Sequence, residues 1–237
     1  QPWMFDSKTF LNTLTALPGV YRMLDERGQA LYVGKARNLK QRVSSYFREN
    51  HASVKTRSLV ARIHAIEVTV THTEVEALIL ESTLIKELQP RYNILLRDDK
   101  GYPYIRASSG DFPRLSLHRG AKRAAGRYFG PYPNANAVCD TLDLLQKVFR
   151  LRSCEDPFFR SRTRPCLQYQ IKRCTAPCVG RVDQASYQRQ LQDAVLFLEG
   201  RSGQVIDDLA QRMEALSAEF KFEEAARCRD QIVELRQ

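Results

Sequence analysis

No stretch of this 237-residue sequence is a long hydrophobic run, and this absence excludes a helix that crosses a membrane. No N-terminal segment has the charged start, apolar centre and small-residue cleavage site of a signal peptide, so we expect a cytoplasmic protein. Low-complexity stretches and internal repeats are also missing. The apolar content of 43% is ordinary for a globular protein, and the length suits one large domain or two to three small ones.

Acidic residues are in short supply relative to basic ones. The 27 Asp and Glu face 37 Lys and Arg, which gives a net charge of +10 and a pI near 9.5. The cations cluster at 35–48, 119–127 and 160–173, with Tyr or Phe among them. Phosphate-binding cations beside stacking surfaces favour nucleic-acid binding. General solubility is the alternative, because many basic proteins bind nothing.

The sequence lacks the close Cys-x2-Cys pairs that are typical of zinc sites. Four of its six cysteines nevertheless lie close together in the chain, with the spacing x11, x7 and x3: Cys154, Cys166, Cys174 and Cys178. In a reducing compartment such a set favours metal or cluster ligation over disulfides. A [4Fe–4S] cluster, an irregular Zn²⁺ site and four unliganded thiols all remain open. Cys139 and Cys228 fall in predicted helices, where we expect them to pack.

Alternating apolar residues and turn chemistry predict a β-hairpin near the N-terminus, with strands at 19–24 and 29–34. Asn38 is the predicted N-cap of a helix from Leu39 to about Phe47, which places Arg42 and Tyr46 on one face. Further elements are expected along the rest of the chain. They are helices at about 55–65, 74–88, 137–149, 184–199, 203–219 and 223–236, a strand at 67–71, and strand-like pieces at 102–108 and 114–119. The last two helices form an antiparallel hairpin that bends at Lys221-Phe222.

The helix predicted at 74–88 carries an anomaly, because Glu81 falls within its apolar face. That face is formed by Ala77, Leu78, Leu84, Ile85 and Leu88. An ionised carboxylate among apolar neighbours is costly unless a cation or a metal compensates it. Glu81 is therefore a candidate metal ligand, or a partner for the cations at 35–48, which include Lys35 and Arg42. The alternative is a boundary glutamate that reaches water or pairs with an arginine.

Several motifs together resemble the GIY-YIG nuclease family. The two tripeptides that give the family its name are matched by Gly19-Val20-Tyr21 and Tyr32-Val33-Gly34. Five more residues stand at the spacing of the family's active-site residues: Lys35, Arg42, Tyr46, Glu81 and Asn93. Within that family the chain is similar to the UvrC excinuclease subunits. The segments that carry this likeness are "KTR" at 55–57, "QPRYN" at 89–93, "LRDDKGYPYI" at 96–105 and "RPCLQYQIKRC" at 164–174. The resemblance covers residues 16–237.

The resemblance implies an α+β fold with a small domain, in which helices flank a three-stranded mixed sheet. A cysteine-rich region and a C-terminal helical hairpin, the UVR motif, would follow. The implied boundaries are 16–95 for the nuclease domain, 96–150 for a connecting α/β segment, 151–182 for the cysteine-rich region, 183–202 for a linking helix and 203–237 for the hairpin. UvrC proteins continue into a second nuclease domain and DNA-binding repeats. We therefore expect an N-terminal part of such a protein, with a naturally short relative as the alternative.

The resemblance also implies a metal-dependent endonuclease. Glu81 would hold one Mg²⁺ or Mn²⁺, largely through water. Tyr32 would be the general base, and Tyr21 would orient the water or share the proton. Lys35, Arg42 and the metal would each favour the phenolate. Arg42 would stabilise the phosphate charge, whereas Tyr46 and Asn93 would position the phosphate or brace the site. For the four cysteines the resemblance favours the [4Fe–4S] cluster.

In the UVR-like hairpin, five of the residues that match the motif are expected to bind a partner: Met213, Phe222, Glu223, Ala226 and Arg229. The partner that the resemblance implies is UvrB, and the substrate is damaged double-stranded DNA, cut 3′ to the lesion in nucleotide excision repair. A hairpin that packs only on its own chain is the alternative. For the whole chain, a non-catalytic DNA-binding scaffold and a free-standing nuclease remain the competing interpretations.

Overall fold

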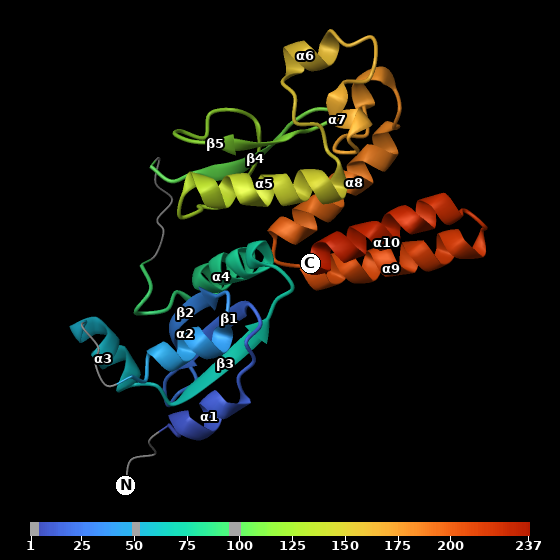
Figure 1. Cartoon of the computed structure of the whole chain (residues 1–237). Helices are drawn as coiled ribbons and strands as arrows, with labels where there is room; N and C mark the ends of the chain where they lie inside the picture. Colours follow the sequence, from blue (N-terminus) through green and yellow to red (C-terminus); the bar gives the residue numbers. More distant parts are fainter. Residues whose placement is uncertain (1–4, 49–52, 95–100) are drawn as a thin grey trace. The chain divides into compact units, whose positions relative to one another are not determined.

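The computed structural model describes residues 5–48, 53–94 and 101–237 (Figure 1). Contacts divide the chain into two compact units, residues 1–95 and residues 96–237. Positions 96–100 of the UvrC-like segment at 96–105 lie outside the described residues. None of the helices in the described ranges is long and apolar enough to cross a membrane.

The first unit is built on a three-stranded antiparallel sheet of β1 (Gly19–Leu24), β2 (Ala30–Ala36) and β3 (Ala65–Val70), in the order β2-β1-β3. The predicted hairpin is confirmed, with Asp25 Oδ1 accepting from the backbone N–H groups of Arg27 and Gln29 in its turn. The α+β class is also confirmed, but the expected mixed sheet is wrong. Since β3 returns along the free edge of β1 in the opposite direction, every pair in the sheet is antiparallel.

Helices cover both faces of this sheet (Figure 1). They are α1 (Ser7–Thr13), α2 (Leu39–Ser45), α3 (Val54–Val60) and α4 (Glu74–Leu88). Alternate side chains of a strand point to opposite faces, so Tyr21 joins a core with Leu39 and Val43 of α2, whereas Val20 and Val33 pack against α4. Asn38 Oδ1 accepts from Gln41 N at 2.9 Å, which confirms the predicted N-cap.

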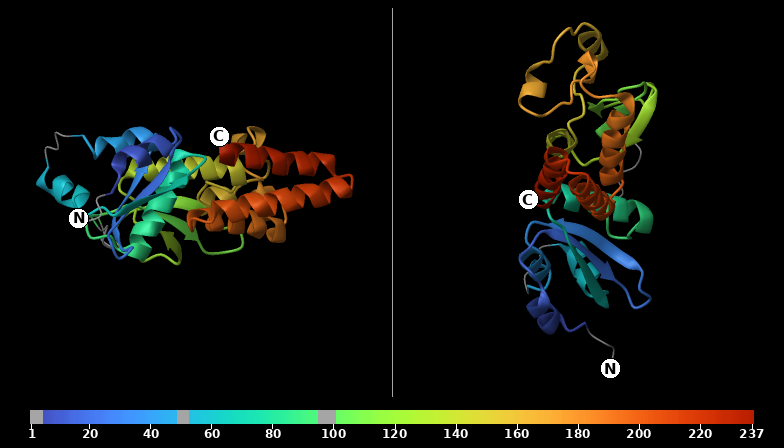
Figure 2. Two further views of the ribbon diagram at one scale, coloured as in Figure 1. Left: turned by 90° about the horizontal axis from the view of Figure 1, so that it is seen from below. Right: turned by 90° about the vertical axis from the view of Figure 1, so that its right-hand side faces the viewer.

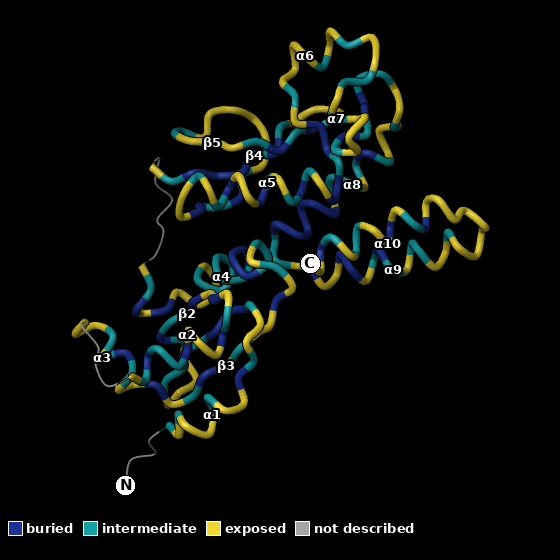
Figure 3. The backbone as a smooth tube through the Cα atoms, viewed as in Figure 1, coloured by how far each residue is buried: buried dark blue, intermediate teal, exposed yellow. Residues whose placement is uncertain are grey.

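The second unit begins with another antiparallel sheet, β4 (Tyr104–Ser108), β5 (Leu115–His118) and β6 (Gly126–Phe129), in the order β5-β4-β6. Helix α5 (Ala135–Phe149) contacts β4 and β5, and its apolar side is buried (Figure 3). The third strand, β6, was not predicted. Its only fully buried residue is Phe129, so the strand carries no clear alternation of apolar and polar residues.

The cysteine region contains only short helices: α6 (Asp156–Arg160), α7 (Leu167–Gln170) and the 3-10 turn η1 (Pro177–Val179). It is followed by α8 (Gln184–Leu198) and by a helical hairpin of α9 (Ser202–Ala218) and α10 (Phe222–Arg236). The two hairpin helices lie side by side along their length (Figure 2). Of the two cysteines expected to pack, Cys228 is buried as predicted, but Cys139 is exposed because it lies on the solvent side of α5.

Candidate active site and cysteine region

Three tyrosines from three different elements meet on one side of the first sheet. Tyr21 comes from β1, Tyr32 from β2 and Tyr46 from the end of α2, and their ring centroids are 5.8 to 6.2 Å apart. The hydroxyls of Tyr21 and Tyr46 share a hydrogen bond of 2.8 Å. The mirrored tripeptides of the sequence therefore place two phenols on adjacent strands, and the four-residue helical spacing brings Arg42 beside the third.

Gly34 makes room for this cluster. In the antiparallel register Gly34 lies opposite Tyr21, and a Cβ at Gly34 would lie 2.5 Å from Tyr21 Cζ and 2.9 Å from Tyr32 Cε1. Real Cβ atoms do not approach other atoms so closely, so any larger residue would displace the Tyr21 ring. The glycine of the second tripeptide is thus required by the phenol of the first.

Cations and one carboxylate surround the phenols. The guanidinium of Arg42 lies 5.6 Å from the centroid of the Tyr46 ring and interacts electrostatically with Tyr21. Lys35 and Arg42 both act on the charge of the Glu81 carboxylate, and each lowers its pKa. The pKa of Glu81 is nonetheless raised, because burial outweighs these favourable contacts. An unneutralised share of negative charge remains at Glu81.

Arg42 favours the phenolates as expected, but burial outweighs it and raises the pKa values of two phenols. Burial raises the pKa of Tyr32 to about 12, with further contributions from Tyr46 and Glu81, and the lowering effect of Arg42 is smaller. The pKa of Tyr21 is also raised, again mainly by burial. Tyr21 is completely buried, so its hydroxyl cannot contact a solvent water directly. Tyr32 is the partly exposed member of the cluster.

Asn93 holds the outer edge of β2. Its Oδ1 accepts from Val33 N at 2.9 Å and its Nδ2 donates to Val33 O at 2.8 Å. Tyr92 extends this pairing through its N–H to Leu31 O, and its hydroxyl bonds to Ser58 Oγ at 2.8 Å. The segment at 90–93 therefore continues the sheet past its edge. This contact places Asn93 as a brace of the strand that carries Tyr32 and Lys35.

A cleft of about 410 Å³ opens beside the tyrosine cluster. Its wall carries four cations, Lys35, Arg37, Arg42 and Arg48, and one acid, Glu74, which forms a 2.8 Å ion pair with Arg37. Lys35 and Arg42 line the cleft, Arg42 also lies beside the Tyr46 ring, and both cations act on the charge of Glu81, so an anion in the cleft would share these two cations with the cluster. The site thus has the charge and the size for a phosphate group.

Glu81 fits a hard divalent cation, because it is an oxygen donor with incompletely neutralised charge. Within the described ranges no three His, Cys, Asp or Glu side chains gather as a complete metal site. A single protein carboxylate is still enough for Mg²⁺, which keeps several of its waters. The apolar setting predicted for Glu81 is present, since Ala77, Leu84 and Ile85 pack against the sheet, but Leu88 is exposed.

The structure gathers the four clustered cysteines within electrostatic range of one another. Burial raises the pKa of Cys174 to about 11, and the other three thiols raise it further. All four are free, and in this thiol form no three of the described side chains reach the spacing of a metal centre. Thiolate donors of this kind suit iron–sulfur or zinc chemistry. The four cysteines therefore have the donor atoms and the mutual proximity that a metal cluster needs, but their thiols do not form a complete metal-coordination geometry.

Arg152 is a residue of this region that sequence reasoning missed. Its side chain is only 6% exposed, and its guanidinium donates to Phe112 O, to Cys154 O at 3.2 Å and to Asp156 Oδ1 at 2.7 Å. It also lies 4.4 Å from the centroid of the Phe159 ring. Arg152 fastens the first cysteine and α6 to the sheet domain. In a chain rich in arginine, no sequence signal separates this one from the exposed ones.

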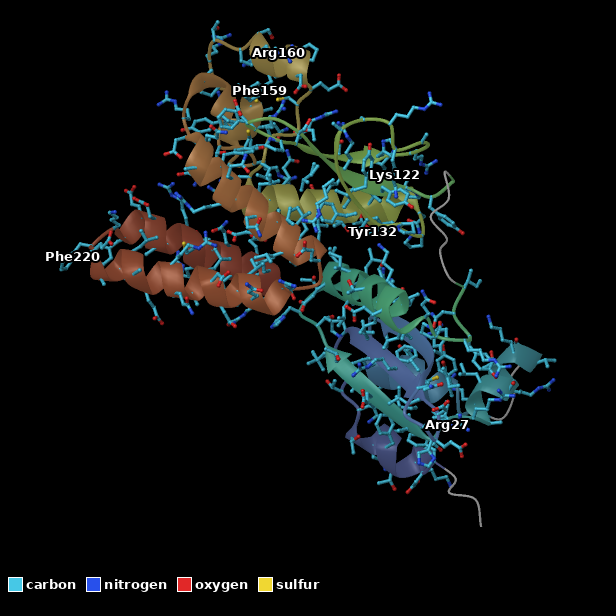
Figure 4. All side chains as sticks on the ribbon, turned by 180° about the vertical axis from the view of Figure 1, so that it is seen from behind. Arg27, Lys122, Tyr132, Phe159, Arg160 and Phe220 are labelled. Atoms are coloured by element: carbon cyan, nitrogen blue, oxygen red, sulfur yellow. The ribbon has the colours of Figure 1, made fainter. Side chains whose placement is uncertain are left out.

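The five predicted partner-binding residues lie on the hairpin, but not all on its surface. Phe222, Glu223 and Arg229 are exposed, whereas Met213 and Ala226 are half-buried. The far end of the hairpin carries two exposed rings, Phe220 and Phe222, in an edge-to-face contact (Figure 4). The near end is anchored to the same unit, where Gln231 Nε2 donates to Val148 O at 2.9 Å.

The sheet, the tyrosine cluster and the cationic cleft define a GIY-YIG-type domain. Residues 17–94 match the family model described as the UvrC-like GIY-YIG domain. Residues 102–197 match the UvrC/Cho excinuclease middle domain, and residues 203–237 match the UvrB/uvrC motif. The chain belongs to the UvrC family.

Two curated relatives are similar over nearly the whole chain, and both are named UvrABC system protein C. The protein of Alkalilimnicola ehrlichii is 61% identical over 232 residues, and that of Nitrosococcus oceani is 60% identical over 233. Each alignment covers 98% of this chain, but only 38% and 39% of the relative. The chain thus spans less than half the length of the curated relatives it matches.

Among solved structures, the chain is similar to the GIY-YIG N-terminal endonuclease domain of UvrC from Thermotoga maritima bound to its catalytic divalent cation, magnesium. Sequence identity is 33%, and the match covers 37% of this chain and 94% of that one, with a TM-score of 0.34. A point mutant of the same domain gives 32% identity and a TM-score of 0.35.

Proposed function

We propose that this chain is the part of a UvrC-type excinuclease that incises damaged DNA on the 3′ side of the lesion, in the bacterial cytoplasm. The observation that carries the proposal is that Lys35 and Arg42, which line the cationic cleft, also act on Glu81, and that Arg42 lies beside the three clustered phenols. Membership of the UvrC family supports the same conclusion. A scaffold that only binds DNA would have no need of a half-buried carboxylate beside a row of phenols.

Phosphodiester hydrolysis requires an activated water and stabilisation of charge on the phosphate. Arg42 and Lys35 line the cleft and bind the phosphate oxygens; the planar fork of Arg42 matches them in two places. Tyr32 accepts the proton of the attacking water, because it is the phenol that reaches solvent. Tyr21 and Tyr46, joined by a hydrogen bond of 2.8 Å, pack against Tyr32, and the Tyr46 ring lies beside Arg42, so the pair holds both side chains in position. Asn93 fixes the strand from its edge.

Glu81 would hold the divalent cation, Mg²⁺ or Mn²⁺. When bound, such an ion supplies positive charge at the scissile phosphate and at the departing 3′ oxygen. The same charge would favour the phenolate of Tyr32, whose pKa the protein alone raises to about 12. The remaining cations of the cleft then position the DNA strand that is to be cut.

For the four cysteines we propose a [4Fe–4S] cluster, with Zn²⁺ as the alternative. Support comes from the mutual proximity of four thiols in one short segment, and from Arg162, which lowers the pKa of Cys178 against the effect of burial. A cluster would give broad visible absorbance near 400 nm that bleaches with dithionite. A colourless preparation that contains zinc after anaerobic purification would contradict the cluster.

For the hairpin we propose UvrB as the partner. The residues at 203–237 match a motif shared by UvrB and UvrC, and two exposed phenylalanines at the hairpin's far end offer apolar surface for a second helix pair. The chain's own α5 covers only the near end. The proposed substrate is accordingly damaged double-stranded DNA on which UvrB has already been loaded.

The proposal is tested with Arg42→Ala in a nicking assay on lesion-containing duplex preloaded with UvrB. Loss of a positioned cation from the developing charge should lower the nicking rate by roughly 10² to 10³. DNA affinity should stay nearly unchanged. The matched control is Arg22→Ala, because Arg22 pairs with Glu67 away from the cleft. Wild-type nicking by Arg42→Ala, or equal loss in both variants, would contradict the assignment.

A further inference from the structure

We propose that residues 157–173 form a second nucleic-acid contact, which binds an unstacked single strand of DNA. This contact is separate from the tyrosine cluster and from the partner hairpin. That the strand is DNA rather than RNA rests on the proposed function. The segment lies wholly within the second unit, between Cys154 and Cys174, and it contains Cys166.

The charge of this segment is of one sign. Residues 157–173 contain five cations and no acid. Two of the five are engaged, since Arg173 pairs with Asp143 at 2.5 Å and Arg162 acts on the thiol of Cys178. Arg160 acts on Asp156, which itself pairs with Arg152, and the described residues provide no ion-paired carboxylate for Arg164 or Lys172. Figure 4 shows Arg160 at the outer end of α6. Such a surface is complementary to a polyanion.

Large apolar side chains lie exposed among these cations. The exposed fractions are 45% for Phe158, 64% for Leu167, 38% for Tyr169 and 50% for Ile171. Arg162 lies 4.9 Å from the centroid of the Phe158 ring. Aromatic faces next to cations are the surfaces on which single-strand-binding proteins stack bases. In a duplex the base faces are already covered, so these rings favour an unpaired strand.

The exposure of Phe158 is built into the local structure. Its neighbour Phe159 packs inward, beneath the Arg152 guanidinium at 4.4 Å and 5.9 Å from the Phe112 ring. Arg152 also holds Asp156 at the start of α6. These contacts fix α6 on the side that faces the rest of the unit. The two consecutive phenylalanines therefore have different environments. Phe159 stabilises the segment, and Phe158 presents its ring to solvent beside Arg162.

The test measures fluorescence anisotropy of the full chain with labelled oligo-dT of about 15 nucleotides, near the site size of single-strand-binding folds. Blunt duplex of equal length is the comparison. Phe158→Ala and Tyr169→Ala should each weaken oligo-dT binding by about tenfold and leave duplex binding within about twofold. Phe158→Tyr should restore the wild-type affinity. Val233→Ala, which truncates another exposed apolar side chain in the same unit, is the control and should leave oligo-dT binding unchanged.

A second measurement uses Gln in place of Arg160 and Arg164, singly and together. Each lost phosphate contact should reduce the slope of log affinity against log salt by about 0.7 for a single strand. Unchanged oligo-dT affinity in both aromatic variants would overturn the proposal, and so would tighter binding of the segment to anionic lipid vesicles than to oligo-dT. Nicking by the wild type and its loss in Glu81→Ala are measured separately, so failure here leaves the proposed function intact.

Discussion

At the scale of single residues, neighbouring side chains limit both the space and the charge that are available in the candidate active site. Gly34 is required by Tyr21, and Glu81 is kept at a raised pKa by the apolar helix face that supports it. The sequence identified all seven candidate residues by motif and spacing. It could not show that Tyr21 is fully buried, because burial depends on how α2 closes over the sheet. For the same reason it could not show that burial outweighs the effect of Arg42, which lowers the pKa of both phenols as expected.

Gly34→Ala tests the steric condition. The added methyl would lie within 3 Å of the Tyr21 and Tyr32 rings, so we expect at least tenfold slower nicking and a loss of about 1–3 kcal/mol in the free energy of unfolding. Urea denaturation and the nicking assay measure the two effects. Gly203→Ala is the control, since no atom lies within 4 Å of its added Cβ. A fully active, fully stable Gly34→Ala variant would show that Tyr21 needs no such space.

Glu81→Gln tests the electrostatic condition in metal-free buffer. The folded-state pKa of Glu81 is raised, so its ionised form destabilises the fold above that pKa. As the pH falls through the folded pKa and below the unfolded value of 4.5, this cost disappears. The variant should therefore be more stable than the wild type at pH 7, and the difference should vanish in acid. Equal stability at both pH values would remove the argument for an unneutralised carboxylate.

The pH dependence of nicking tests the role of Tyr32. A phenol with a pKa of about 12 is almost wholly protonated near neutrality, so a phenolate base becomes more abundant as the pH rises. The single-turnover rate should increase about tenfold per pH unit until the apparent pKa in the loaded site is reached. Tyr32→Phe should lose most of the rate together with this slope. A residual rate in that variant with the wild-type slope would assign the base elsewhere.

At the scale of elements, local signals in the sequence were enough for the long helices and the hairpin turn. The bounds of α4 match the prediction at 74–88, because Thr73 caps its start and Pro90 follows its end. The helix expected at 55–65 ends already at Val60, since Ala65 belongs to β3. Neither α6 nor α7 was predicted. Both are one turn long and are held by tertiary contacts such as those of Arg152, which no local pattern reveals.

Arg152→Gln tests whether that arginine holds the cysteine segment. The substitution removes charge-assisted hydrogen bonds to Cys154 O and Asp156, so the free energy of unfolding should fall by about 2–3 kcal/mol. Iron or zinc content per chain should fall in parallel. Arg181→Gln, an exposed arginine of the same unit, is the control. Full metal content in Arg152→Gln at wild-type stability would show that Cys154 is positioned by other contacts.

At the scale of the whole molecule, the two units carry separate tasks. The first contains the phenols and the cationic cleft, and the second contains the cysteine segment and the hairpin. Removing residues 203–237 should weaken recruitment to UvrB–DNA. Because the hairpin is anchored through Gln231, a cleaner variant is Phe222→Ala, which should weaken UvrB binding about tenfold or more without unfolding the chain. Unchanged UvrB binding by both variants would favour a hairpin that serves only its own chain.

The most direct test of the central claim is the nicking of an end-labelled duplex that carries one bulky lesion and is preloaded with UvrB. The chain is added with Mg²⁺, wild type beside Glu81→Ala, with binding measured in parallel. The account predicts a single cut 3′ to the lesion, absent in the variant and in EDTA, with DNA binding retained. Equal nicking by wild type and variant, or intact binding with no cut by either, would contradict a metal-dependent active site at Glu81.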